Sequence, residues 1–342
     1  MTSDSGLSTP APSAVPKKPG WRERFKRRPL NARLRIGLGI LGAYLIVAVS
    51  AVVIFWSSLT RLTPNSVWIP GPPWGPLVGP SWAHPFGVVD GLGVDMLQAL
   101  WQATPWDLSI VAAILLIDLA IGWTLGALAG MNEGGGFDFA VTLFSDSVGA
   151  IPSFFLVVVL FGGITAYGLV PSSLPLFVLV FGLVLWPATA RLTRERAREV
   201  IRQPYIEAAR ASGADRGRIL RRHVMPGSLP AVLAQIPVDV APIFFVLTVF
   251  PWFWDCASLG FETKESALYF LPSLPGFSPL PSVLFPEWGN ILAVGVCEGF
   301  PLVVGSPVYW WMFLYPLLAI LGLGIGITLV CDGLQRRWAT TY

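Results

Sequence analysis

Charged residues are scarce in this chain. Only 13% of the 342 residues are Asp, Glu, Lys or Arg, whereas 54% are hydrophobic. Soluble domains carry about 25% charged residues, so the composition excludes an ordinary water-soluble fold and indicates a membrane protein. Two histidines and three cysteines are also too few for a zinc or haem framework. We therefore expect no metal and no cofactor.

Sequence motifs of catalysis are absent as well. The chain has no phosphate-binding loop of the form G-x-x-x-x-G-K-[ST], and no H-E-x-x-H, C-x-x-C or G-x-S-x-G pattern. It is therefore predicted not to be an enzyme and not to hydrolyse ATP by itself. No secretory signal peptide is apparent, because the first apolar run, which starts near Ile36, is long enough to span and to remain as a signal-anchor.

Long apolar stretches are the main feature that is present. A bilayer core about 30 Å thick requires roughly 20 apolar residues in a helix. Six stretches meet this requirement, at about residues 36–58, 108–131, 139–163, 174–190, 231–252 and 309–331. The sequence thus predicts an all-α membrane protein with six transmembrane helices.

Positive charges are distributed unevenly. Of the 23 Lys and Arg residues, nine lie at 17–35, ten at 191–222, and two are Arg336 and Arg337. Because cationic loops stay in the cytosol, the N-terminal tail, the basic loop and the C-terminus are assigned to that side, which six spans satisfy. We predict a multi-pass protein of the cell (inner or plasma) membrane, in contact with lipid, with both termini cytosolic and no nucleic-acid partner.

Two long external segments follow from this topology. Residues 59–107 and 253–308 are rich in Pro, Gly and Trp and poor in Lys and Arg. Their Trp residues are compatible with an interfacial belt or with a cap on the outer mouth of a pathway, and the turn-rich composition favours the cap. Cys256 and Cys297 fall in the second segment, where a disulfide and two free thiols both remain open, whereas Cys331 should be free.

The basic loop contains a predicted helical hairpin at residues 204–226, PYIEAARASGADRGRILRRHVMP. Pro204 suits the first turn of a helix, and Gly213 suits the position just after its end. Asp215 is a candidate N-cap for a second short helix, which Pro226 is predicted to end. A basic hairpin against a membrane indicates a docking site for a soluble partner.

Glu207-Ala208-Ala209 followed by Gly213 resembles the EAA signature of permease subunits in binding-protein-dependent ABC transporters. Further segments resemble the C-type permeases of dipeptide and oligopeptide importers, in that family's order: HPFGVVDGLGVDML at 84–97, PATAR at 187–191, His223 with Pro226 in place of RHxxP, PEWGNIL at 286–292 and CDGL at 331–334. The chain also departs from the family. Val94 replaces an arginine, PWFWDCASLGF stands where a Ser- and Gly-rich stretch is expected, and residues 262–286 form an insertion.

The resemblance implies a permease with six spans that forms half of the translocation pathway of an ATP-driven importer for peptides or a similar solute. It implies that the EAA loop is a cytosolic coupling helix, with ATPase-coupling residues Ile206, Glu207, Ala208, Ala209, Arg210 and Gly213. The implied partners are a homologous permease subunit, two ATPase subunits and an extracytoplasmic substrate-binding protein.

The domain organisation follows from the spans and the resemblance together. A disordered, basic cytosolic tail at 1–35 precedes the first transmembrane helix at 36–58 and an external segment at 59–107. The permease core at 108–334 contains the EAA loop, 191–227, and the external insertion, 253–308, and a cytosolic tail follows at 335–342.

Three aspartates, Asp118, Asp146 and Asp239, lie within predicted spans. An ionised carboxylate there costs about 2.5–3.5 kcal/mol, so each indicates either a proton or substrate relay or a polar contact at a helix interface. Asp146, Gln235 and Asp239 are candidates for lining a pathway. Two other functions remain open: a proton-coupled secondary transporter that uses these aspartates, and a structural membrane subunit without transport.

Overall fold

The computed structural model describes residues 31–56, 78–89, 94–166, 174–259, 287–299 and 309–339. Residues 1–30 of the tail predicted at 1–35 lie outside the described residues, as do residues 59–77 and 90–93 of the first external segment and the insertion at 262–286. The side chains of Cys256 and Cys297 also lie outside them. Cys331 is a buried free thiol, as predicted.

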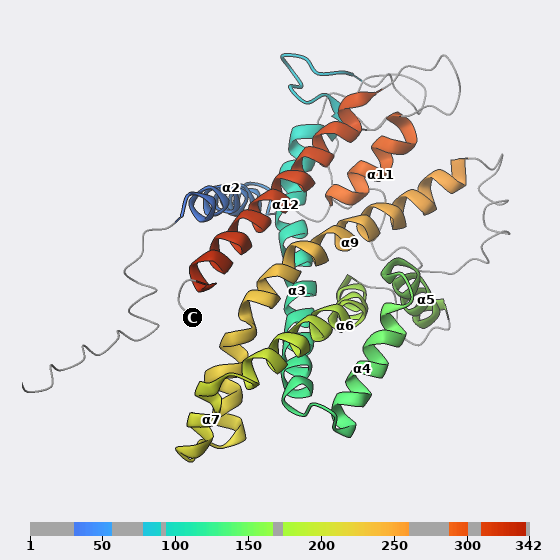
Figure 1. Cartoon of the computed structure of the whole chain (residues 1–342). Helices are drawn as coiled ribbons and strands as arrows, with labels where there is room; N and C mark the ends of the chain where they lie inside the picture. Colours follow the sequence, from blue (N-terminus) through green and yellow to red (C-terminus); the bar gives the residue numbers. More distant parts are fainter. Residues whose placement is uncertain are drawn as a thin grey trace, which may run out of the picture.

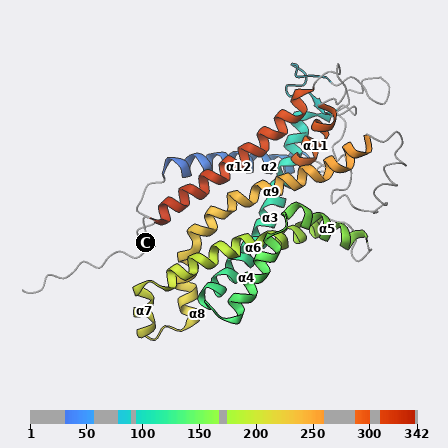
Figure 2. The ribbon, with the colours of Figure 1, turned by 45° about the vertical axis from the view of Figure 1, so that its right-hand side comes forward.

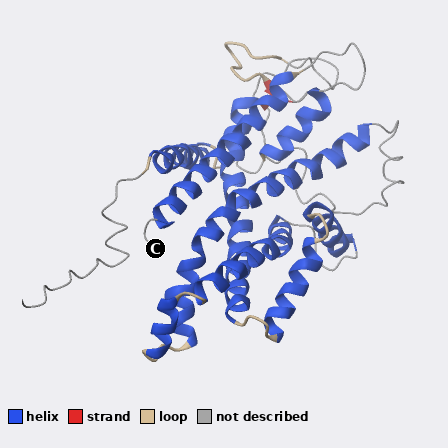
Figure 3. Cartoon of the chain, in the orientation of Figure 1, coloured by secondary structure: helices blue, strands red, loops and turns tan. Residues whose placement is uncertain are grey.

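The described part of the chain is helical except for one small β-hairpin (Figures 1 and 3). Its helices are α2 (Ala32–Ile54), α3 (Met96–Met131), α4 (Gly136–Gly149), α5 (Ser153–Ala166), α6 (Leu174–Ile201), α7 (Pro204–Ala211), α8 (Arg216–Ile219), the π-turn η1 (Leu220–Val224), α9 (Met225–Leu259), α11 (Trp288–Gly299) and α12 (Trp310–Ala339). Strands β1 (Val88–Val89) and β2 (Val94–Asp95) pair in antiparallel fashion.

Five of these helices are long and apolar enough to cross a membrane: Ala32–Ile54, Met96–Met131, Leu174–Ile201, Arg216–Val249 and Trp310–Trp338. They correspond to the first, second, fourth, fifth and sixth predicted spans. Large apolar side chains such as Ile46 and Val53 of α2 are exposed, which is the surface that a lipid environment covers.

The third predicted span is not one continuous helix. Residues Gly136–Gly149 and Ser153–Ile164 form a bent pair with an angle of 92° between the two helices. Pro152 stands at the break, where its missing N–H and its clash with the preceding residue interrupt a helix. The apolar stretch predicted at 139–163 is therefore present as two apolar helices that meet at a sharp bend, not as one straight helix.

Helices α3 and α6 make the most extensive helix contact among the described elements, and glycines spaced four residues apart lie in it. A Cβ atom added at Gly122 would lie 2.7 Å from Thr189 Cβ, and one at Gly130 would lie 2.6 Å from Ala197 Cβ. Gly126, between them, faces the backbone of α6. Such small residues allow two helix backbones to approach closely within a membrane.

The same contacts show that α3 and α6 run parallel, because positions advance together along both helices. Both helices end near the hairpin of α7 and α8, at one end of the bundle, whereas α11 and the strands lie at the other end (Figures 1 and 2). The bent pair of α4 and α5 therefore returns the chain toward the beginning of α6.

The segment that precedes α3 lies at the end of the bundle opposite the hairpin and is bonded to two helices. His84 Nδ1 contacts Asp95 Oδ2 at 2.9 Å, and Asp95 Oδ1 accepts the backbone N–H of Gln98 at 3.0 Å, which caps α3. Trp311 Nε1 of α12 donates to the carbonyl of Val88 at 3.3 Å. These bonds attach the segment both to α3 and to α12.

Candidate functional site

The EAA-like segment forms the predicted helical hairpin. Pro204 is the first residue of α7, and Gly213 follows its end with φ = 81°, a left-handed conformation that suits glycine. Asp215 accepts the backbone N–H of Arg218 at 3.3 Å and so caps α8. These three local predictions are confirmed.

The predicted end of the second helix is wrong. Pro226 does not terminate it, because Arg216–Val249 is one continuous helix that includes α8, the π-turn η1 and most of α9. The π-turn at Leu220–Val224 ends two residues before the proline, so the regular hydrogen-bond pattern of the helix is already interrupted there. The hairpin is thus continuous with a membrane-spanning helix.

The hairpin is held to the bundle by an apolar cluster. Ile206 is fully buried, together with Ile219 and Val224, against Ala197 and Val200 at the end of α6. It is also the one buried residue of α7. The sequence placed Ile206 among the coupling residues, but its side chain lies in the interior and anchors the hairpin to α6.

The other candidate coupling residues share a solvent-exposed surface. Glu207, Ala208, Arg210 and Gly213 are exposed, and Ala209 is half-buried. Neither Glu207 nor Arg210 forms an ion pair with any of the described residues. A charged and unpaired surface carrying small alanines can accept a close-fitting partner.

An ionic network next to the hairpin was not anticipated. Asp138, at the start of α4, accepts hydrogen bonds from Arg194 and, at 2.7 Å, from Arg198 of α6. Glu133 pairs with Arg202 at 2.7 Å. The turn between α3 and α4 is therefore tied to the cationic end of α6. The positive-charge count found the arginines, but the sequence has no signal for their partners.

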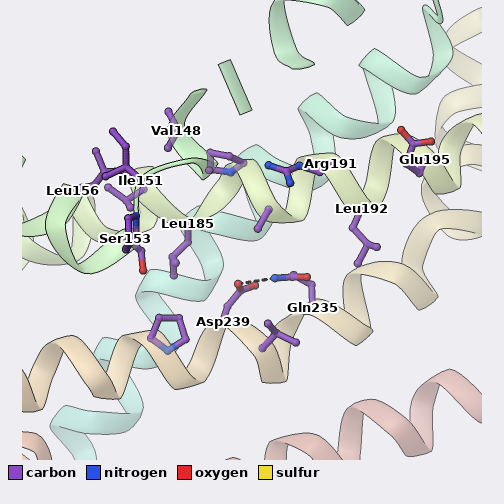
Figure 4. Close-up of a pocket in the computed structure, with 17 residues that line it drawn as sticks. Val148, Ile151, Ser153, Leu156, Leu185, Arg191, Leu192, Glu195, Gln235 and Asp239 are labelled. Carbon is purple, nitrogen blue, oxygen red and sulfur yellow. Dashed lines mark hydrogen bonds between the residues drawn. The ribbon is translucent and has the colours of Figure 1, made fainter. Parts of the chain in front are cut away.

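A cavity of about 580 Å³ lies between α6, α9 and the break between α4 and α5 (Figure 4). Its lining is mainly apolar, with five polar or charged side chains: Ser153, Arg191, Glu195, Gln235 and Asp239. Gln235 Nε2 donates to Asp239 Oδ1 at 2.8 Å on the wall formed by α9.

The three predicted pathway residues are only partly brought together. Gln235 and Asp239 line the cavity side by side, whereas Asp146 is not among its lining residues. Asp146 is exposed and lies 3.4 Å from Arg191, which does line the cavity. Asp118 is fully buried and accepts a hydrogen bond from Thr189 Oγ1 at 3.1 Å.

A second buried acidic contact lies toward the opposite end of the bundle. Glu287 accepts the backbone N–H groups of Gly289 at 2.7 Å and Asn290 at 2.8 Å, and Asp107 Oδ2 accepts that of Trp288 at 3.0 Å. Burial away from water raises the pKa of the Glu287 carboxyl to about 7. The sequence reasoning missed both this contact and the glycine series at 122, 126 and 130, although the latter is visible as a regular spacing of four.

The sequence of this chain is similar to a protein family and to several curated proteins. The protein family described as "Binding-protein-dependent transport system inner membrane component" matches residues 122–337. The dipeptide transport system permease protein of Alkalihalophilus pseudofirmus is 27% identical over 338 residues, which cover 96% of this chain and 94% of that protein.

Two further relatives have other peptides in their names. The glutathione transport system permease protein of Pectobacterium atrosepticum is 29% identical over 257 residues, or 75% of this chain and 72% of that protein. The oligopeptide transport system permease protein of Bacillus subtilis is 24% identical over 315 residues, or 92% of this chain and 88% of that protein.

Proposed function

Because the chain belongs to the family of inner membrane components of binding-protein-dependent transport systems, we propose that it forms half of the translocation pathway of an ATP-driven importer for peptides or a similar solute. It is a permease subunit, a transport component rather than an enzyme. Relatives named for dipeptides, glutathione and oligopeptides support a peptide substrate, without a preference for one length.

The hairpin is the observation that carries the coupling role. Its exposed face presents Glu207 and Arg210 without ion-pair partners among the described residues, next to small alanines. We assign this face to the ATPase subunits. Ala208 permits close approach, Glu207 offers a carboxylate to a donor on the partner, and Gly213 permits the turn that the hairpin requires.

The packing of the hairpin suggests how movement reaches the pathway. Ile206 connects α7 to the end of α6, and α8 continues through η1 into α9. Helix α6 carries Arg191 of the cavity, and α9 carries Asp239. A displacement of the docked hairpin would therefore move two walls of the cavity together. If the ATPase subunits bound the hairpin more tightly in one conformation of the permease than in the other, they would shift the equilibrium between the inward-open and outward-open states.

The pathway itself is proposed to lie between this chain and a homologous permease. Gln235 and Asp239 supply polar contacts on its wall, and Arg191, paired with Asp146, supplies a cationic one. Such a wall carries hydrogen-bonding groups for the ends of a peptide, on a mainly apolar lining.

The topology proposed for this function has six crossings, with α4 and α5 acting together as one broken span. Helices α3 and α6 run parallel, so the chain must return between them. Six crossings also keep the basic hairpin and both termini on the cytosolic side. The external segments would then face the substrate-binding protein.

The two rival functions make different predictions. A proton-coupled secondary transporter needs no ATPase and leaves the exposed hairpin without a role. A structural subunit would bind the ATPase without substrate-dependent ATP hydrolysis in the assembled complex. ATPase capture separates the first rival from the proposal, and substrate-stimulated ATP hydrolysis separates the second.

The coupling role is tested by purifying the full chain in mild detergent and asking whether ATPase subunits are captured with it. The test variant combines Glu207→Arg with Gly213→Trp. Its control combines Glu199→Arg, on an exposed residue of α6, with Gly134→Trp. Gly134 is also a positive-φ glycine, at 75°, with no atom within 4 Å of an added Cβ.

We expect the wild-type and control chains to capture ATPase subunits and the hairpin variant to lose them, with all three equally monodisperse. Capture by the hairpin variant at the wild-type level would refute the assignment of this surface. If the folded wild-type chain captured no ATPase, the importer proposal itself would fail.

A further inference from the structure

Two carboxyl groups meet inside the helix bundle, where α3, α6 and α9 come together. Asp118 of α3 is fully buried, and Asp239 of α9 is 3% exposed. The two carboxyl groups lie within hydrogen-bonding range of each other. The sequence showed two separate aspartates in different spans and did not pair them.

Neither carboxyl group is neutralised by the protein. Among the described residues, the donors to this pair are Thr189 Oγ1, to Asp118 at 3.1 Å, and Gln235 Nε2, to Asp239 at 2.8 Å. Both donors are uncharged. Asp118 Oδ1 and Asp239 Oδ2 are buried and have no donor in the described part of the chain.

Other charged groups near the pair are engaged elsewhere or lie across the cavity. Arg191 of α6 pairs with Asp146 of α4 at 3.4 Å, and Arg191 and Glu195 line the cavity that Asp239 also lines. No ion pair to Asp118 or Asp239 is formed by the described residues. Two ionised carboxylates in contact in such a place repel each other strongly, and each also pays for its loss of hydration.

We propose that Asp118 and Asp239 form a binding site for a single proton, which the two carboxyl groups share. The shared proton supplies the donor that Asp118 Oδ1 and Asp239 Oδ2 lack, and it reduces the charge of the pair to −1. Two carboxyl groups that hold one proton between them are a known solution when like charges cannot both ionise. This site does not depend on the proposed importer function, and it requires no net proton transport.

The position of the pair links its protonation to the cavity. Asp239 lines the cavity, whereas Asp118 is not among the lining residues. Water that entered the cavity would meet Asp239 first, and this would give the shared proton a route of exchange. Loss of the proton at high pH would leave two facing anions and weaken the contact between α3 and α9. Rising pH is therefore expected to favour conformations in which these helices separate.

Infrared spectroscopy of the full chain in lipid nanodiscs tests the proton directly. A protonated carboxyl group gives a carbonyl band that shifts in D2O, and we expect the wild-type protein to show one from this pair at neutral pH. Asp118→Asn and Asp239→Asn should each remove it, because an amide supplies the missing donor to the remaining carboxylate. The double variant should lose no more intensity than either single one.

Matched controls separate this band from others. Asp146→Asn changes an exposed aspartate near the same cavity and should leave the band unchanged. The measurement is repeated in an Asp107→Asn background, because the buried contact of Asp107 with Glu287 is another source of such a band. A band that survives both single substitutions, or a double variant that loses twice the intensity of each single one, would overturn the shared proton.

The pH dependence of thermal unfolding provides a second readout that does not rely on band assignment. Wild-type stability should fall as pH rises from 6 to 9, and Asp118→Asn and Asp239→Asn should both show a flatter profile. A wild-type slope that both variants retain in full would also overturn the proposal.

Discussion

Replacement of Ile206 by alanine distinguishes an anchor from a docking contact. Ile206 is fully buried and is the one buried residue of α7, which is only eight residues long. A helix of this length is not stable in water by itself. Truncation of a buried isoleucine to alanine costs about 2–5 kcal/mol, and a loss of about 3 kcal/mol raises the open population of a local segment on the order of 100-fold.

Hydrogen exchange of the α7 backbone amides measures this opening in the isolated chain in nanodiscs, without ATPase subunits. We expect Ile206→Ala to accelerate exchange across α7 on the order of 100-fold. Ile206→Val, which costs about 0.5–1.5 kcal/mol, should accelerate it about tenfold or less. Exchange in the core of α3 should remain unchanged, because the membrane-spanning helices retain their own packing.

Two control variants test whether the effect depends on the buried position of Ile206. Ile36→Ala removes the same atoms from a side chain that is 56% exposed on α2, and should leave exchange in α7 unchanged. Glu207→Ala alters the exposed face and should weaken ATPase capture without changing exchange. If Ile206→Ala left the protection of α7 at the wild-type level, the reasoning that this one side chain holds the hairpin would be refuted.

Two further predictions concern the bundle. Gly126→Val should destabilise the protein by about 1–3 kcal/mol, because the new side chain would meet the backbone of Ala190. Its control, Gly39→Val, lies in open space on α2 and should be nearly neutral. Equal losses of stability in thermal unfolding would contradict the close packing of α3 against α6. Burial raises the pKa of Glu287 from 4.5 to about 7, so the folded state favours the protonated carboxyl group. The stability that this protonation contributes is complete below pH 4.5 and is lost as pH rises through about 7. Glu287→Gln should flatten thermal stability over that interval, and an unchanged slope would count against the burial effect.

Local sequence signals predicted the hairpin well and its surroundings poorly. Pro204, Gly213 and Asp215 have backbone roles that depend on immediate neighbours, and the structure agrees with all three. The prediction that Pro226 ends the helix is wrong: a proline normally ends a helix, but a π-turn before this one allows the helix to continue. The continuation of the helix through the π-turn and Pro226 depends on residues on both sides of the proline.

Side-chain roles that depend on distant contacts were harder to infer. Ile206 and Glu207 are neighbours in one short motif, yet one is buried and the other exposed. Their difference follows from the position of α7 on the end of α6, which no local pattern records. Likewise, Asp138 showed no sign of its partners, because Arg194 and Arg198 lie more than 50 residues away along the chain.

The sequence by itself determined the class of this protein, because apolar length, charge asymmetry and short motifs are properties of contiguous segments. It indicated a helical membrane protein, located its spans and identified the hairpin and the family. Only the tertiary structure decided that the third span is broken, that Ile206 is an anchor, and that Asp118 and Asp239 meet. These features arise where separate helices pack together, and the free energy of a buried charge depends on neighbours that the order of residues does not reveal.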